Sequence, residues 1–189
     1  MDFSHDVEQS LSVLKAGGII LYPTDTIWGI GCDATRPDAV EKVYALKQRA
    51  ENKAMIILVA DEREILKWVA QPDLRVFDYL KFQSRPTTVI YEGGVGLADN
   101  LVAPDRTIAI RIVKDDFCRH LIKRFRKPLV STSANISGEA APAFFDDITD
   151  TIKRGVNYTV HWRRDDKAVR PPSSVIRWNS RGEPEILRP

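Results

Sequence analysis

Three short polar segments carry side chains that could bind an anion, and the first is Pro23 to Gly31. It follows an apolar run at Ile19–Tyr22 and offers two threonine hydroxyls, a carboxylate and two glycines. The β-branched and aromatic run suits a buried strand, and Pro23 cannot donate to a sheet, so we expect the strand to end there. Ligands of α/β proteins bind beyond strand ends. The alternative for this segment alone is a Pro-initiated turn capped by Asp25.

The second segment, Lys47 to Lys53, has cations at positions 47, 49 and 53. On a regular helix Lys47 and Arg49 would point apart, but at a helix end both can face one ligand. The planar fork of arginine and the mobile charge of lysine both suit phosphates. The alternative is a solvated helix end whose cations are favoured by the helix dipole.

The third segment, Ser131 to Gly138, is rich in hydroxyl and amide side chains and directly follows an apolar stretch at 128–130. Such a loop can offer hydroxyls and backbone N–H groups to an anion, although it could equally be a helix N-cap followed by a turn. No histidine or cysteine lies nearby in sequence to activate a serine, so we do not expect a nucleophilic serine. A metal held by protein ligands alone is not expected either. Together the segments predict a polyanion site suited to nucleotidyl or phosphoryl transfer.

The elements that must position these segments alternate between helical and extended patterns. This alternation predicts one α/β domain over residues 1–189, and connections too short for a crossover helix predict a mixed sheet. The expected helices are 5–16, 37–48, 61–70, 73–82, 115–125 and 144–153. The expected strands are 19–22, 55–59, 89–91, 107–113, 128–130, 158–162, 173–178 and 184–187.

Composition restricts the class of protein further. The 189 residues are 43% hydrophobic and 29% charged, which is typical of a globular chain. No apolar run approaches the roughly 20 residues of a membrane span, and the N-terminus does not resemble a signal peptide, so we expect a cytoplasmic protein without a membrane partner. The net charge of +2 says little about nucleic acid. Cys32 and Cys118 fit no metal spacing and are expected to be reduced and buried.

Five stretches, in order, resemble the motifs of one family, the YrdC-like threonylcarbamoyl-AMP synthases. YPTDTIWGIG at 22–31 resembles P-T-[ED]-T-x-x-G-x-G, and KQR at 47–49 resembles K-x-R. AIRI at 109–112 resembles A-V-R-V, and STSANISG at 131–138 resembles S-T-S-A-N-x-S-G almost letter for letter. PSSVI at 172–176 resembles the late P-S-T-[IV]-[IV].

The resemblance implies the short, single-domain form of the family fold. This fold is a twisted, mostly open sheet flanked by helices, with a large concave basic cavity. It also implies an L-threonylcarbamoyladenylate synthase, which makes threonylcarbamoyl-AMP and pyrophosphate from L-threonine, bicarbonate and ATP. Partner proteins would then pass the carbamoyl group to an adenosine of tRNA.

Residue roles follow from matching positions in the resemblance. Threonine would be bound by Thr26, Arg111, Ser131 and Ser174. ATP would be bound by Lys47, Arg49, Lys53, Thr107, Ser133, Asn135 and Ala141. The catalytic group would be Lys47, Arg49, Ser133 and Asn135. Mg²⁺ would be carried on the triphosphate rather than held in a protein cage.

The chain departs from the family pattern at Ala50, Arg85 and Leu58, where relatives often have proline, glycine and histidine. The alternative function is an RNA-binding YrdC/YciO-type paralogue without synthase activity, because Arg119–Lys127 and the later cations at 163, 164, 167 and 170 could bind double-stranded RNA. For Arg119–Lys127 we prefer an amphipathic helix with a solvated basic face, and no aromatic-rich RNA motif is visible.

Overall fold

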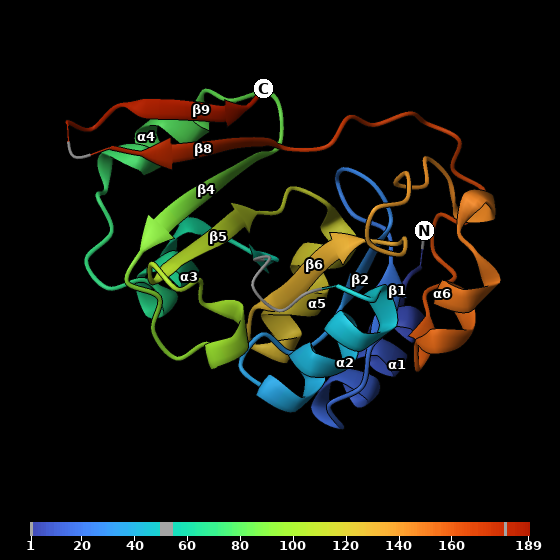
Figure 1. Ribbon diagram of the computed structural model, residues 1–189. Coiled ribbons are helices and arrows are strands. Elements are labelled where there is room, and N and C mark those ends of the chain that lie inside the picture. Colours follow the sequence, from blue (N-terminus) through green and yellow to red (C-terminus); the bar gives the residue numbers. More distant parts are fainter. Residues whose placement is uncertain (1, 50–54, 180) are drawn as a thin grey trace.

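A computed structural model describes residues 2–49, 55–179 and 181–189, and its centre is one long sheet (Figure 1). The helices are α1 (Ser4–Lys15), α2 (Pro37–Lys47), α3 (Glu62–Trp68), α4 (Arg75–Lys81), α5 (Asp116–Phe125) and α6 (Asp150–Gly155), with 3-10 turns η1 (Asp99–Leu101) and η2 (Phe145–Asp147). The strands are β1 (Ile20–Tyr22), β2 (Gly29–Gly31), β3 (Ile56–Val59), β4 (Thr87–Glu92), β5 (Thr107–Ile112), β6 (Leu129–Ser133), β7 (Tyr158–Thr159), β8 (Ser174–Trp178) and β9 (Pro184–Arg188).

The sheet is mixed, as the short connections predict. Its strand order is β7-β1-β2-β6-β3-β5-β4-β8-β9. The pairs β1–β7, β3–β5 and β4–β8 are parallel, and the other pairs are antiparallel. Neighbouring strands therefore come from distant parts of the chain.

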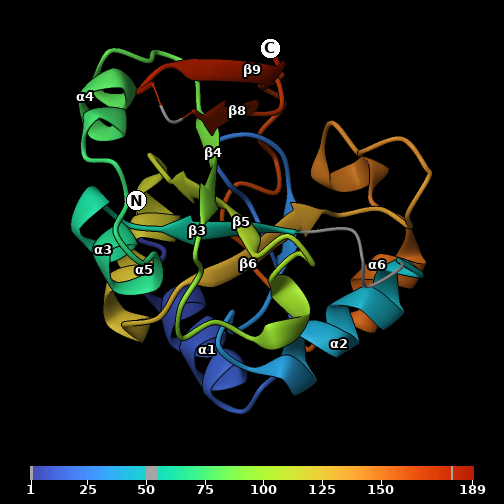
Figure 2. The ribbon, with the colours of Figure 1, turned by 60° about the vertical axis from the view of Figure 1, so that its left-hand side comes forward.

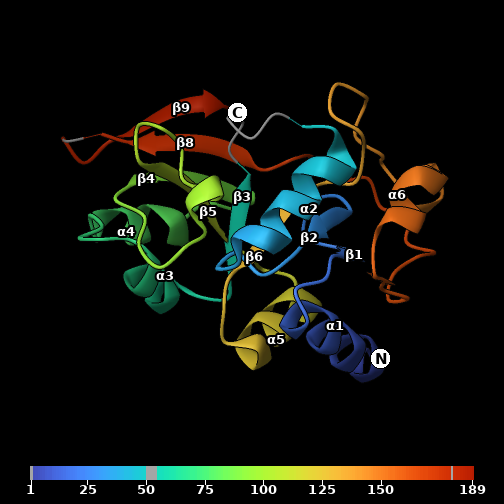
Figure 3. The ribbon, with the colours of Figure 1, turned by 60° about the horizontal axis from the view of Figure 1, so that its bottom comes forward.

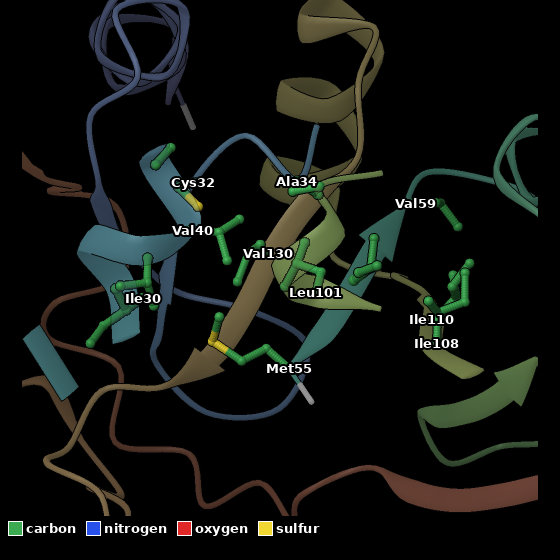
Figure 4. Packing of buried hydrophobic residues seen from close by; sticks show 14 of the residues in the cluster. Ile30, Cys32, Ala34, Val40, Met55, Val59, Leu101, Ile108, Ile110 and Val130 are labelled. Carbon is green, nitrogen blue, oxygen red and sulfur yellow. The ribbon is translucent and has the colours of Figure 1, made fainter. Parts of the chain in front are cut away.

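One face of the sheet is covered by the larger hydrophobic core. Strand residues such as Ile30, Val130 and Ile110 pack there against Val40 of α2 and Leu101 of η1 (Figure 4). Helices α3, α4 and α6 add further apolar side chains to this cluster. Burial of this face fixes the register of every strand that crosses it, because a one-residue slip would reverse the two faces.

The opposite face is covered only in part. Helices α1 and α5 lie side by side on it and bury a second cluster that includes Ile20, Leu58 and Leu129 (Figures 2 and 3). Alternate strand residues point to the same face, so Ile56 and Ser131 lie on this face beyond the two helices. This uncovered region of the sheet is where the candidate site lies.

Three elements differ from the sequence-based expectation, and the first is the strand expected over 158–162, which is only Tyr158–Thr159 (β7). Gly29–Gly31 forms β2, paired antiparallel with β1 and β6, so the polar segment after Pro23 is the turn between two strands. A three-residue strand with two glycines lacks the alternating apolar pattern that predicts strands. The helix expected over 144–153 is divided into η2 and α6 by an extended stretch at Ile148 and Thr149.

Helix α2 and the two cysteines are as the sequence predicts. Helix α2 begins with Pro37 and ends before Gln48, whose left-handed φ of 50° turns the chain toward Arg49. Cys32 and Cys118 are free and buried. In the described part of the chain, no helix combines the length and apolarity needed to cross a membrane.

Candidate functional site

A cavity of about 540 Å³ lies on the uncovered region of the sheet. Its lining residues come from seven strands, which are β2 to β6, β8 and β9, and from the segments beside them, including the turn after β1. The lining residues named here share polar or cationic side chains: Thr24, Thr26, Arg49, Thr88, Arg111, Ser131, Thr132, Ser133, Ser173 and Arg188. Within the described chain, the charged side chains of the lining are therefore three arginines. A cavity of this kind attracts anions.

The turn between β1 and β2 presents hydroxyls at one end of the cavity. The hydroxyls of Thr24 and Thr26 lie 3.0 Å apart, and Thr24 Oγ1 also donates to the carbonyl of Ile27 at 2.8 Å. The same atom accepts the backbone N–H of Thr26 at 3.1 Å. These bonds give the turn one defined geometry, so Thr26 is held facing the cavity.

Arg111 is the buried cation at this end. It lies on β5 with its side chain 4% exposed, and its Nη2 is 3.1 Å from Oδ1 of Asp25, which is 9% exposed. The second carboxylate oxygen of Asp25 accepts the backbone N–H of Lys114 at 3.0 Å. Arg111 Nε is buried and has no hydrogen-bond acceptor among the described residues. The guanidinium therefore keeps donor capacity for a further acceptor, such as a carboxylate.

Lys47 does not line the cavity. It is 1% exposed, and its Nζ donates to the carbonyls of Ser133 and Asn135 at 2.5 and 2.6 Å. Burial, and secondly the charge of Arg49, lowers the pKa of Lys47 to about 8. The backbone carbonyl of Lys47 accepts the N–H of Ser137 at 2.8 Å. Lys47 thus connects the serine-rich loop to the end of α2, and its Nζ is directed at the loop carbonyls rather than into the cavity.

Asn135 is held inside the same loop. Its Nδ2 donates to the carbonyls of Ile136 and Glu139 at 2.9 and 2.8 Å. Its Oδ1 is buried and accepts no hydrogen bond from any residue that the structure describes. Ser131 and Ser133, on β6, do line the cavity, as do Arg49 and Ala141.

Besides Lys47 and Asn135, two more expected site residues do not line the cavity, and one lies outside the described residues. Ser174 faces away from the cavity and shares a hydrogen bond of 3.0 Å with Thr87, because the alternation along β8 turns Ser173 inward instead. Thr107 bonds to Asp105 at 2.7 Å and lines a different cavity, at the start of β5. Lys53 lies outside the described residues.

The structure adds lining residues that sequence reasoning missed. Ser173 shares a hydrogen bond of 2.9 Å with Thr88, and its carbonyl accepts Nε and Nη2 of Arg188 at 3.1 and 2.8 Å. Burial, followed by the charges of Arg111 and Arg85, lowers the pKa of Arg188. Arg188 stands far from every recognised motif, so no local signal in the sequence marks it.

The structure describes two of the three residues that depart from the family pattern, and neither lines the candidate cavity. Leu58 is buried under α1 and α5 and does not reach the cavity. Arg85 donates to the carbonyl of Pro172 at 3.2 Å and lines a separate cavity. Ala50 lies outside the described residues. In the described parts of the chain, no group of three or more His, Cys, Asp or Glu side chains is placed to hold a metal ion.

Comparisons with known proteins identify relatives of this chain by sequence and by fold. The Sua5/YciO/YrdC family profile, described as "Telomere recombination", matches residues 12–189. A Stenotrophomonas maltophilia protein named threonylcarbamoyl-AMP synthase is 37% identical over 136 residues, which are 70% of this chain and 73% of the relative.

Two solved structures share the fold. P. abyssi Sua5 complexed with L-threonine superposes with a TM-score of 0.86 at 19% identity, over 100% of this chain and 55% of that one. This chain therefore spans only about half of that protein. E. coli YciO superposes with a TM-score of 0.82 at 20% identity, over 97% of this chain and 88% of that one. Because the profile match covers nearly the whole sequence, the chain belongs to the Sua5/YciO/YrdC family.

Proposed function

We propose that the protein is an L-threonylcarbamoyladenylate synthase, a nucleotidyltransferase that uses L-threonine, bicarbonate and ATP. The observation that carries the proposal is the convergence of three arginines and the hydroxyls of two motif segments on one cavity. The relative named threonylcarbamoyl-AMP synthase supports the same activity.

In the proposed site, the amino acid lies at the Thr26–Arg111 end. Arg111 grips its carboxylate, and Thr26, Ser131 and Ser173 surround the rest of it. Ser173 takes the place first assigned to Ser174, because its side chain is the one that lines the cavity. A carboxylate bound by an arginine fork is held in a fixed orientation, which the transfer step requires.

The nucleotide lies toward Arg49, Ser133 and Ala141 in this proposal. Threonine and bicarbonate condense to a carbamate with loss of water, and a carbamate oxygen then attacks the α-phosphorus of ATP. The bond from this phosphorus to the bridging oxygen breaks, and pyrophosphate leaves with its Mg²⁺. Arg49 stabilises the charge on the phosphates. Lys47 and Asn135 act by holding the loop that presents Ser133.

The wider assignment follows from this reaction. We propose that residues 1–189 form one functional domain, that the product serves threonylcarbamoyl modification of tRNA with partner proteins, and that this occurs in the cytoplasm. Direct binding of double-stranded RNA remains the alternative function.

The charge distribution favours the enzyme over the RNA-binding alternative. The cations of 163–170 bind groups of the same chain: Arg163 pairs with Asp115, Lys167 with Asp146, and Arg170 with Asp166. Arg164 donates to the carbonyls of Val160 and Thr159. Of the two basic clusters, both within the described residues, the basic face of α5 remains for a phosphate backbone, and this helix is anchored by buried Phe117, Leu121, Ile122 and Phe125.

The test is release of pyrophosphate with ATP, threonine and bicarbonate, and with each of them omitted in turn. The proposed enzyme releases pyrophosphate only when all three are present. Release that does not depend on threonine would contradict the proposal. Arg49→Ala should abolish the signal, whereas Arg124→Ala, on the exposed face of α5, should retain it. An RNA-binding protein would instead release none, and its affinity for RNA would fall with salt and with Arg124→Ala.

A further inference from the structure

Arg163 adopts a backbone conformation that L-residues rarely take. It lies in the segment between β7 and β8 with a left-handed φ of 63°. The Cβ of a non-glycine residue is crowded in this region, so glycine would be preferred. Such strained residues persist where surrounding contacts determine the conformation, and they cluster at functional sites. The contacts of Arg163 therefore indicate what its side chain does.

The guanidinium joins two segments beside the candidate site. Its Nη1 donates to Oδ2 of Asp115 at 2.5 Å, and its Nη2 donates to the carbonyl of Thr24 at 2.5 Å. The side chains of Arg163 and Asp115 are 20% and 8% exposed. Oδ1 of Asp115 accepts the N–H of Cys118 at the start of α5. Because the pair is largely removed from water, both bonds are strong and directional.

The Thr24 carbonyl is the middle one of three acceptors by which the turn after β1 is held. The carbonyl of Pro23 accepts the thiol of Cys118 at 3.2 Å, and Oδ2 of Asp25 accepts the N–H of Lys114. Lys114 belongs to the β5–α5 connection that follows Arg111, and Cys118 belongs to the first turn of α5. Of these three donors, Arg163 is the one that comes from the segment between β7 and β8.

We propose that Arg163 is a positioning residue for the amino-acid end of the site. It does not line the cavity, but it fixes the turn that carries Thr26 and the Asp25 carboxylate that orients Arg111. This inference rests on the proposed function. A turn that relaxes by a fraction of an ångström weakens the grip on the amino acid and leaves the phosphate end, built by α2 and β6, unchanged.

The variants are Arg163→Gly and Arg163→Lys, with Arg126→Gly as the matched control. Glycine suits a left-handed φ, so the first variant removes the side chain without straining the backbone. Arg126 also has a left-handed φ, of 61°, at the C-terminal end of α5, and it makes none of the three hydrogen bonds that hold the turn. Arg163→Lys keeps one charge but loses the fork that bonds both partners.

The expected result is a selective loss of amino-acid affinity. Arg163→Gly should raise the KM for threonine about 10-fold and change the KM for ATP by less than about 2-fold, as expected when one binding end is loosened. The KM of Arg163→Lys for threonine should lie between those of Arg163→Gly and the wild type. Arg126→Gly should have the KM values of the wild type. Millimolar guanidinium, compared with sodium chloride at equal ionic strength, should lower the raised KM of Arg163→Gly by filling the vacated space.

Two measurements without catalysis separate this inference from the proposed function. Calorimetry measures threonine affinity, and hydrogen exchange measures opening of the amides of Thr24, Asp25 and Thr26. Faster exchange at these amides in Arg163→Gly, but not in Arg126→Gly, supports the positioning role. Unchanged exchange, an equal rise in both KM values, or the same effect in Arg126→Gly would overturn it. If the wild type binds no threonine, the proposed function fails and the exchange data alone decide the role of Arg163.

Discussion

Replacement of Lys47 by methionine tests whether this residue holds the serine-rich loop or acts on phosphate. The side chain is 1% exposed, and its Nζ donates to the carbonyls of Ser133 and Asn135 at 2.5 and 2.6 Å. Methionine has a similar length and volume but cannot donate. Lys47→Met therefore leaves two carbonyls without their donor while the packing is retained.

The size of the effect follows from the two bonds. A hydrogen bond to a charged group contributes about 1.5–3 kcal/mol, so two would contribute roughly 3–6 kcal/mol. The buried ammonium also lacks hydration, and its removal offsets part of the loss. We expect a net loss of about 2–4 kcal/mol in the free energy of unfolding. At about 2–4 °C per kcal/mol for a chain of this size, the unfolding temperature falls by roughly 5–15 °C.

Chemical and thermal unfolding measure this loss, and pyrophosphate release is followed on the same samples. Lys123→Met is the control, because Lys123 lies on the exposed face of α5, where substitutions change stability by less than about 0.5 kcal/mol. Should Lys47→Met unfold at the wild-type temperature yet lose activity, the ammonium would be acting on the substrate and the structural reasoning would be wrong.

The pH dependence gives a second test of the same residue. The pKa of Lys47 is lowered to about 8 by burial and secondly by Arg49, whereas its ordinary value is 10.5. Between these values the unfolded chain binds more protons than the folded one, so stability rises with pH. The difference in stability between wild type and Lys47→Met should widen from pH 8 to pH 10.

Three further predictions concern other residues. Arg49→Ala should lower kcat/KM by about 100-fold or more, because the charge on the phosphates is no longer stabilised. Its unfolding temperature should stay within about 2 °C of the wild type, because Arg49 is only half-buried. A large loss of stability would contradict the assignment of Arg49 to substrate binding. Arg111→Ala should raise the threonine requirement by about 100-fold, and an unchanged threonine dependence would exclude it from the site. Asp6→Asn should cost about 2–3 kcal/mol at pH 7, because the buried carboxylate accepts bonds from the Tyr158 hydroxyl and the His161 amide. Burial alone would raise the pKa of Asp6, but these hydrogen bonds outweigh it and lower the pKa. The stability that the Asp6 carboxylate contributes above about pH 4 should therefore disappear as the pH falls through its lowered pKa in the folded protein. A cost that stays constant down to pH 2 would refute this.

Much of the fold could be predicted from the sequence, because hydrophobic periodicity marks most helices and strands. The apolar run of β3 correctly indicated an interior strand, which lies between β6 and β5. Strand β2 was missed because two glycines remove the side-chain pattern on which such predictions depend.

The sequence predicts which segments form the candidate site, but not which side chains of these segments face the cavity. Motifs correctly indicated that Thr26, Arg49, Arg111 and Ser131 converge, but the direction of a side chain depends on tertiary contacts. Ser174 pairs with Thr87 in register, which turns the adjacent serine toward the cavity. The inward direction of the Lys47 side chain likewise depends on carbonyls 86 and 88 residues away, which local sequence does not reveal.

The thiol of Cys118, which donates to the carbonyl of Pro23, provides a chemical probe of the turn after β1. Burial, and secondly the charge of Asp115, raises the pKa of Cys118, so a thiol-modifying reagent reacts only when the turn and α5 separate. Cys32 is buried in the other hydrophobic cluster, on the opposite face of the sheet. Labelling kinetics of the two thiols in one native sample would therefore distinguish brief separation of the turn from unfolding of the whole molecule.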